Sequence, residues 1–355
     1  MFLELMPAYD LALSRHEAFW HREIIDRPPI MISLPKPGAK PFPHKEHETL
    51  KARWLDIEYR AEAADHALSN TLFPYDLMPI AQTNLGPEIF SAWCGCGYEY
   101  GEDTTWSTPC IFDWEKDHDN ARLDMNHPLF KTLVRFTELL IERGRGRFLV
   151  GLTDFHPGGD HLTALRDPMA LNIDMIENPE WVDYMLERSM PEYYSVYGVF
   201  YHMIRQAGMP ATSWLPLVHD GTYYIPSNDF SCMISKMMFD EHFLPGIRQE
   251  CKFYERSIYH LDGPDAIRHL DSLLEIPELD AIQWVFGAGN EGFARWRGLY
   301  QRIQAAKRGI WLHCAPSELT DVFDSLKPEG VCFDIGGIKT PDEAEAVVKR
   351  ITAWK

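Results

Sequence analysis

The chain has 355 residues, of which 45% are hydrophobic, and a formal net charge of -19. This length and composition suit one large α/β domain with a sizeable core. An acidic chain without a basic stripe argues against nucleic acid or an anionic membrane surface as a partner, and no apolar run of about eighteen residues is present to span a bilayer.

The N-terminus and the cysteines indicate a cytoplasmic protein. Residues 1–5 lack the basic region and the long apolar segment of a signal peptide. The seven cysteines are an odd number without a regular spacing. Reduced thiols in a cytoplasm are therefore the simplest interpretation. The sequence leaves a homodimer open.

The first part of the chain predicts helices that are separated by irregular segments. Helices are expected over residues 10–26 and 47–68. Residues 71–126 are rich in aromatic residues and glycine, and they predict strands and loops that cover one end of a domain. We therefore expect residues 1–67 to form a helical extension that packs against a larger unit, residues 68–355.

A regular alternation of helices and strands begins at residue 127. The expected strands cover residues 148–153, 214–218, 256–260, 280–285, 310–313 and 330–335. The expected helices cover residues 127–144, 168–176, 179–207 with an interruption at Pro191, 231–252, 264–274, 291–307, 317–326 and 341–353. Such alternation predicts parallel strands with crossover helices. With two more strands from the preceding residues, it predicts an α/β fold of the TIM (β/α)8 barrel type with an N-terminal helical extension; a doubly wound open sheet is the alternative.

Polar and aromatic side chains follow the predicted strands at the end where TIM barrels bind ligands. His260 and Asp262 lie two residues apart in an extended segment and should point to the same side. A structural histidine beside a helix-capping aspartate is the alternative. We expect Asp220, His260 and Asp262 to be catalytic, because carboxylates and imidazoles serve as acids and bases. The residues expected to bind substrate are Asp154, His156, His219, Gln283, Trp284 and His313.

Several segments resemble the uroporphyrinogen decarboxylase superfamily, which includes corrinoid-dependent methyltransferases. They are Asp220 with the following Ile225-Pro226-Ser227, the stretch Phe239–Ile247, the His-x-Asp-Gly of residues 260–263, and the Gly-Gly-Ile-Lys-Thr-Pro-Asp-Glu of residues 336–343. The resemblance covers about residues 68–355 and implies a TIM barrel with its site at the carboxyl ends of the strands.

The metal ligands of the resembled methyltransferases are largely replaced in this sequence. Asp262 and Gly336 stand where the resemblance implies cysteines, and Gln283 stands where one branch has a glutamate. Of that ligand set only His260 remains, so no thiolate zinc is expected and no metal ligand is assigned. Binding of another divalent ion by His260 and Asp262, or of zinc together with His219, stays open.

Methyl transfer from a small methylated substrate to a corrinoid protein or a similar acceptor is the function that the resemblance favours. A corrinoid would then be present only through a partner protein. One alternative is a decarboxylase or lyase that acts on a small polar ligand, and another is a non-catalytic barrel that binds a small molecule. Uroporphyrinogen decarboxylation itself is disfavoured, because residues 30–45 contain no arginine to clamp a polycarboxylate.

Overall fold

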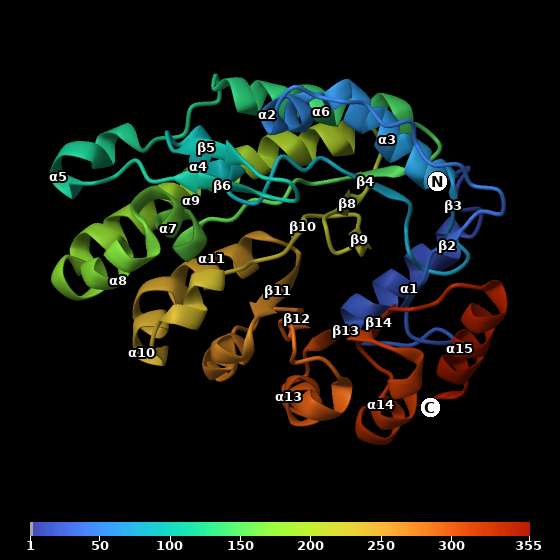
Figure 1. Cartoon of the computed structure of the whole chain (residues 1–355). Helices are drawn as coiled ribbons and strands as arrows, with labels where there is room; N and C mark the ends of the chain where they lie inside the picture. Colours follow the sequence, from blue (N-terminus) through green and yellow to red (C-terminus); the bar gives the residue numbers. More distant parts are fainter. Residues whose placement is uncertain (1–2) are drawn as a thin grey trace.

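The polypeptide folds into a curled, mostly parallel β-sheet with helices packed along its outside (Figure 1). The computed structural model describes residues 3–355. Six strands form the main sheet in the order β1-β14-β13-β12-β11-β10, and neighbouring strands are parallel. Their bounds are Ile30–Met31 (β1), Tyr223–Tyr224 (β10), Arg256–Asp262 (β11), Ala281–Val285 (β12), Gly309–Cys314 (β13) and Val331–Ile335 (β14). Parallel pairing is what strand-helix alternation predicts, because each crossover helix returns the chain to the same end of the sheet.

A second parallel pair continues the curl. It consists of β4 (Ile80–Gln82) and β7 (Leu149–Gly151), and the amide of Leu152 donates to the carbonyl of Thr212 at the end of β8. The antiparallel pairs are β2 (Leu34–Pro35) with β3 (Thr71–Leu72), β5 (Gly97–Tyr100) with β6 (Thr105–Thr108), and β8 (Ala211–Thr212) with β9 (Val218–His219). The fold is therefore mixed α/β with a curled parallel half-barrel. This agrees with the predicted α/β class, whereas a closed eight-stranded barrel goes beyond these strand pairings.

Helices follow most of the parallel strands. Before β10 they are α1 (Tyr9–His21), α2 (Leu50–Leu55), α3 (Ile57–Ser69), α4 (Ile89–Trp93), α5 (Trp114–Asp117), α6 (Pro128–Gly144), α7 (Gly158–Arg166), α8 (Pro168–Glu177) and α9 (Pro179–Gln206). After β10 they are α10 (Lys236–Met238), α11 (Leu244–Phe253), α12 (Leu270–Leu274), α13 (Phe293–Ala305), α14 (Leu319–Ser325) and α15 (Pro341–Ala353). Short 3-10 turns cover His118–Asn120 (η1), Asp229–Met233 (η2), Pro264–His269 (η4) and Pro316–Glu318 (η5), and a π-helical turn covers Phe239–Phe243 (η3).

The helix boundaries follow from local chemistry that the sequence contains. At the start of α15 the hydroxyl of Thr340 accepts from the amide of Glu343, whose carboxylate accepts from the amide of Thr340 in return.

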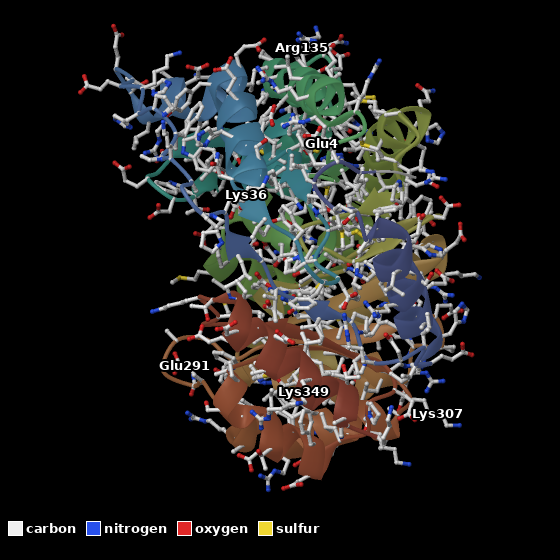
Figure 2. All side chains as sticks on the ribbon, turned by 90° about the vertical axis from the view of Figure 1, so that its right-hand side faces the viewer. Glu4, Lys36, Arg135, Glu291, Lys307 and Lys349 are labelled. Atoms are coloured by element: carbon white, nitrogen blue, oxygen red, sulfur yellow. The ribbon has the colours of Figure 1, made fainter. Side chains whose placement is uncertain are left out.

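Figure 2 shows charged side chains such as Arg135, Lys307 and Lys349 on the outside of the molecule, where all three are exposed. Within residues 3–355, the helices are too short or too polar to cross a bilayer.

The inner face of the sheet has an apolar layer and, above it, a polar layer. The apolar layer includes Ile258, Ala281 and Trp311, which pack with Phe19 and Trp20 of α1. Alternate residues of a strand share a face. The side chains two positions further toward the carboxyl ends therefore lie on the same inner face: His260, Gln283, His313 and, on β14, Asp334. Helix α1 thus closes one end of the sheet and leaves the polar layer at the other.

A buried carboxylate fixes the N-terminal segment beneath the sheet. Asp76 is fully buried and accepts hydrogen bonds from the guanidinium groups of Arg15 and Arg27 and from the amide of Ile30 in β1. β1 lies within the first 67 residues and pairs with β14, so these residues supply a strand as well as helices. The division between an extension, residues 1–67, and a barrel, residues 68–355, stays a prediction.

Three sequence predictions are wrong in detail. The expected strand over residues 214–218 is absent except for Val218, which begins β9: the chain turns back there, because β9 pairs antiparallel with β8. Pro191 lies inside α9 without ending it. The expected helix over residues 231–252 is divided into η2, α10, η3 and α11, and Pro245 near the start of α11 supplies a reason, since proline lacks the amide that would continue the helical hydrogen bonds.

Candidate functional site

His260 is the centre of the polar layer. It stands beside Gln283 in the parallel register of β11 and β12, and its Nδ1 lies 2.6 Å from the Gln283 Oε1. Because that oxygen only accepts, Nδ1 carries the proton and a neutral His260 keeps Nε2 as an acceptor. The edge of the Trp214 ring packs against the imidazole, with 5.1 Å between ring centres. The imidazole is therefore held in one orientation with Nε2 free for chemistry.

Two carboxylates lie beside the imidazole of His260. Its Nε2 is 3.8 Å from the Asp229 Oδ1, and one ligand atom each from Asp229, His260 and Asp262 all lie within 4.8 Å of one another. The Ser227 hydroxyl donates to Asp229 at 3.1 Å, and Ser227 itself is bridged to His260 through the backbone. Burial, followed by the negative charge of Asp229, raises the pKa of Asp262. The trio therefore combines a carboxyl group of raised pKa with an imidazole acceptor.

The loop after β7 contributes a second acid–base group. The carboxylate of Asp160 accepts from the backbone amides of Asp229 (3.1 Å) and Phe230 (2.9 Å), so it fixes the turn that carries Asp229. Burial and then the charge of Asp229 raise the pKa of Asp160 to about 6. His156 donates from Nε2 to Asp154 at 2.8 Å; burial lowers its pKa, but Asp154, Asp160 and Asp229 outweigh burial and raise it to about 9. His156 is therefore a cation at neutral pH.

A second histidine–carboxylate pair lies further along the inner face. His313 Nδ1 is 2.8 Å from the Asp334 Oδ2, across the register of β13 and β14. The hydrogen bond to Asp334 is the main cause that raises the pKa of His313. Both side chains are at least a third exposed, at 50% and 39%, so this pair faces the open end of the sheet.

The structure brings together some of the residues predicted from sequence and separates others. His260, Asp262 and Gln283 form the centre, with His156, Asp154 and His313 on neighbouring strand ends. Trp284 points to the opposite face of β12, where it is 2% exposed and packs edge-on against Trp296.

His219 and Asp220 lie away from the His260 centre, because the turn after β8 reverses the chain. His219 contacts Trp20 of α1 and lies 3.5 Å from a carboxylate oxygen of Glu255. Asp220 pairs with Arg205 at 2.9 Å, and its side chain is 89% exposed. The expected strand over residues 214–218 would have placed both residues at its carboxyl end, whereas β9 carries them back toward α1.

Asp229 and Trp214 were not predicted from the sequence, and Asp160, one of the polar residues that follow the strand predicted over residues 148–153, was given no role there. All three come from segments whose path the sequence pattern does not define. The position of Asp229 two residues after Ser227, beside a segment that resembles the family, was the sequence signal that could have identified it as a site residue. Asp160 follows two glycines at the start of α7, a helix that the pattern did not predict.

The group around His260 is a hard donor set. It offers one imidazole nitrogen and carboxylate oxygens from Asp229 and Asp262, and among residues 3–355 no cysteine sulfur joins it. It does not fit the thiolate zinc of the resembled methyltransferases, because zinc of that type needs soft thiolate ligands. A divalent ion that prefers oxygen ligands fits these three side chains better.

A glycine-rich loop between β12 and α13 has the Gly-x-Gly-x-x-Gly spacing of dinucleotide-binding loops, at Gly287, Gly289 and Gly292. All three glycines have positive φ angles. However, the amide of Phe293 at the start of α13 donates to the Glu318 carboxylate at 2.6 Å. A carboxylate therefore already occupies the helix end where a phosphate would bind, and its charge would repel one.

Comparison with known proteins identifies a shared fold. No family model matches the chain, and no curated protein matches it. Among solved structures, a methyltransferase from Methanosarcina mazei is similar over 96% of this chain and 97% of its own, with a TM-score of 0.55 and 12% sequence identity. At this identity the likeness defines the fold class, a methyltransferase-like α/β fold, and assigns no residue.

Proposed function

We propose that the protein is a methyltransferase that moves a methyl group from a small O- or N-methylated substrate to a nucleophilic acceptor. The observation that carries the proposal is the Asp229–His260–Asp262 group at the carboxyl ends of the strands. It occurs in a chain whose fold matches a methyltransferase over nearly its whole length. A corrinoid carried by a partner protein is the acceptor that we favour.

The chemistry requires a proton donor for the leaving heteroatom. The acceptor attacks the methyl carbon, the bond from carbon to the heteroatom breaks, and the heteroatom keeps the electron pair and takes a proton. Asp262 suits this role because burial raises its pKa, so it holds its proton to higher pH than an exposed aspartate. His260, fixed by Gln283, takes up a proton from solvent at Nε2 and passes it to the Asp262 carboxylate that remains after the transfer. Asp229 stabilises the imidazolium that exists between these two proton transfers.

Substrate binding is assigned to the polar groups around this centre. Asp154, His156 and His313 face the same end of the sheet, and several buried polar atoms there have no hydrogen-bond partner within the described residues. They include the Thr153 Oγ1, the Ser213 Oγ, the Trp214 Nε1 and the His156 Nδ1. Because buried polar groups are normally paired, such atoms are suited to bind a polar substrate.

We further propose that the curled sheet closes into the TIM barrel of the uroporphyrinogen decarboxylase superfamily. Three backbone hydrogen bonds support closure: Asp76 N to Ile30 O, Leu149 N to Pro79 O, and Leu152 N to Thr212 O. They join β1 to Asp76 in the segment before β4, β7 to Pro79 directly before β4, and the residue after β7 to β8, which is the order that such a barrel requires. An experimental structure with a gap of several strand spacings between β1 and β4 would contradict this part.

The experiment is a screen of O- and N-methyl compounds with the protein and a reduced free corrinoid, followed by mass spectrometry of both products. Methyl transfer predicts a demethylated substrate and a methylated corrinoid in equal amounts. A product that has lost carbon dioxide, or that is cleaved without methyl transfer, would instead support the decarboxylase or lyase alternative. No turnover of any compound, under conditions where one of them binds, would support a binding protein and contradict the proposal.

A further inference from the structure

A cavity of about 230 Å³ lies beside helices α9 and α11. It is bounded by α9, α11, the π-helical turn η3 and the loop before η2, which lie together in Figure 1 beside α10. Its walls include the apolar side chains of Leu186, Met190 and Ile247, whereas His260 and Asp262 are not part of its lining. We name it the α9–α11 cavity. Local π-helical turns are frequent at functional sites, and here one forms part of the wall.

Two buried polar side chains at this cavity have unused hydrogen-bonding atoms. Asn228 is 3% exposed, and neither its Oδ1 nor its Nδ2 has a partner in residues 3–355. Glu250 is 2% exposed, and its Oε2 is likewise without a partner in the described chain. Tyr193 donates to the Glu250 carboxylate and accepts in turn from Tyr254 at 2.6 Å. Because nearly all buried polar groups in proteins are paired, a ligand in the cavity would supply the missing partners after a small movement of these enclosed side chains.

The charge of the cavity favours a cation. Glu187 and Glu241 are exposed at its lining, and Asp183 is paired there with His242 at 2.7 Å. The pKa of Glu250 is raised to about 8, mainly by burial. The charge of Asp160 also raises it, whereas the charge of His156 and the hydrogen bond from Tyr193 lower it. The titratable groups that interact with Glu250 from the surrounding elements are His156, Asp160, Tyr193, Tyr194, Tyr224, Cys251, Tyr254 and Tyr259. Asp183, Glu187, Glu241 and His242 line the same cavity. An anion would meet the negative charges of Glu187 and Glu241 at the lining.

We propose that the α9–α11 cavity binds a small primary ammonium ion. Its N–H groups donate to the Glu250 Oε2 and the Asn228 Oδ1, and its carbon chain contacts Leu186, Met190 and Ile247. Three donors and a positive charge satisfy both unpaired acceptors and compensate the buried carboxylate. The inference does not rest on the proposed methyl transfer, because the ammonium contacts none of Asp229, His260 and Asp262, although Ser227 lies between the two sites.

Binding is coupled to the release of a proton. The empty cavity holds Glu250 in its protonated form at neutral pH, and the ion pair with the ammonium forms only when that proton leaves to solvent. At about pH 7 a group with a pKa of about 8 is roughly 90% protonated, so about 0.9 proton is released for each amine bound. The dissociation constant therefore falls about tenfold for each unit of pH up to about pH 8, and levels off above it.

Isothermal titration calorimetry of the full chain with straight-chain primary amines tests the proposal, using two buffers that differ in ionisation enthalpy. The matching alcohols and carboxylates are the ligand controls. Glu250→Gln should weaken amine binding by at least about tenfold and abolish proton release, because a charge-assisted hydrogen bond is lost. Glu329→Gln, which removes the same charge from an exposed position, should change neither.

The wild-type pH series keeps the proposal testable even where Glu250→Gln fails to fold. Amine binding that strengthens with pH as described, and releases a proton, supports the site. Alcohols or carboxylates that bind as tightly as the amines would overturn it. So would amine binding without proton release, or the absence of binding by every amine across the pH range. None of these results depends on whether the protein transfers methyl groups.

Discussion

Glu250→Gln is expected to remove a large part of the pH dependence of stability. The carboxyl is 2% exposed, and burial raises its pKa from 4.5 to about 8. A carboxyl whose pKa is raised in the folded state binds a proton that the unfolded chain has already lost, so its contribution to stability falls as pH rises between the two values. Linkage gives a loss of about 2.5 kcal/mol between about pH 5 and 7, and about 1.4 kcal/mol more by about pH 9.

Urea unfolding followed by tryptophan fluorescence measures this change. The difference in unfolding free energy between Glu250→Gln and the wild type should grow in favour of the variant by about 2.5 kcal/mol from about pH 5 to 7, and then by about 1.4 kcal/mol to about pH 9. Glu329→Gln, at an exposed position, should show a constant difference near zero. A Glu250→Gln difference that stays constant over this range would refute the argument, because Glu250 would then titrate alike in the folded and unfolded states.

Two further substitutions separate the structural core from the exposed surface. Asp76→Ala should lower the free energy of unfolding by about 3–5 kcal/mol in the same urea assay, because it leaves Arg15 and Arg27 buried without their carboxylate; a loss below about 1 kcal/mol would contradict the network. Asp220→Ala should change stability by less than about 0.5 kcal/mol and leave methyl transfer unaltered, since its exposed carboxylate pairs with Arg205 alone among the contacts described for residues 3–355. A tenfold loss of activity in Asp220→Ala would return this residue to the site.

The parallel sheet was predictable because its strands have strong local signals. Residues 256–260 contain the strand formers Ile258 and Tyr259, residues 330–335 are mostly apolar, and each is followed by a helix pattern; the structure has β11 and β14 there. The region before residue 127 shows no regular alternation of strand and helix patterns, so its strands were not predicted. The hairpin of β8 and β9 was misread for a related reason: residues 214–218 are apolar enough for a strand, but their path depends on tertiary contacts such as the hydrogen bond from the Trp20 indole to the Val218 carbonyl.

The candidate site was predictable where it follows the strand register and not where it depends on loops. His260 and Gln283 are side by side because β11 and β12 are neighbours in the sheet, and that order follows from the alternation. Asp229 reaches the same place through an irregular turn that is held by Asp160, about seventy residues earlier in the chain. Contacts over such distances leave no periodic trace in a single sequence.

The most direct test of the central claim compares methyl transfer by the wild type, His260→Ala and Asp262→Asn, with Asp324→Asn as an exposed control. The rate of corrinoid methylation is followed by its absorbance, with the best substrate from the screen. Loss of the proton donor or of its imidazole partner should lower the rate by about 10²–10⁴-fold, while the control retains the wild-type rate. Wild-type rates in both His260→Ala and Asp262→Asn would contradict the assignment of the reaction to this centre.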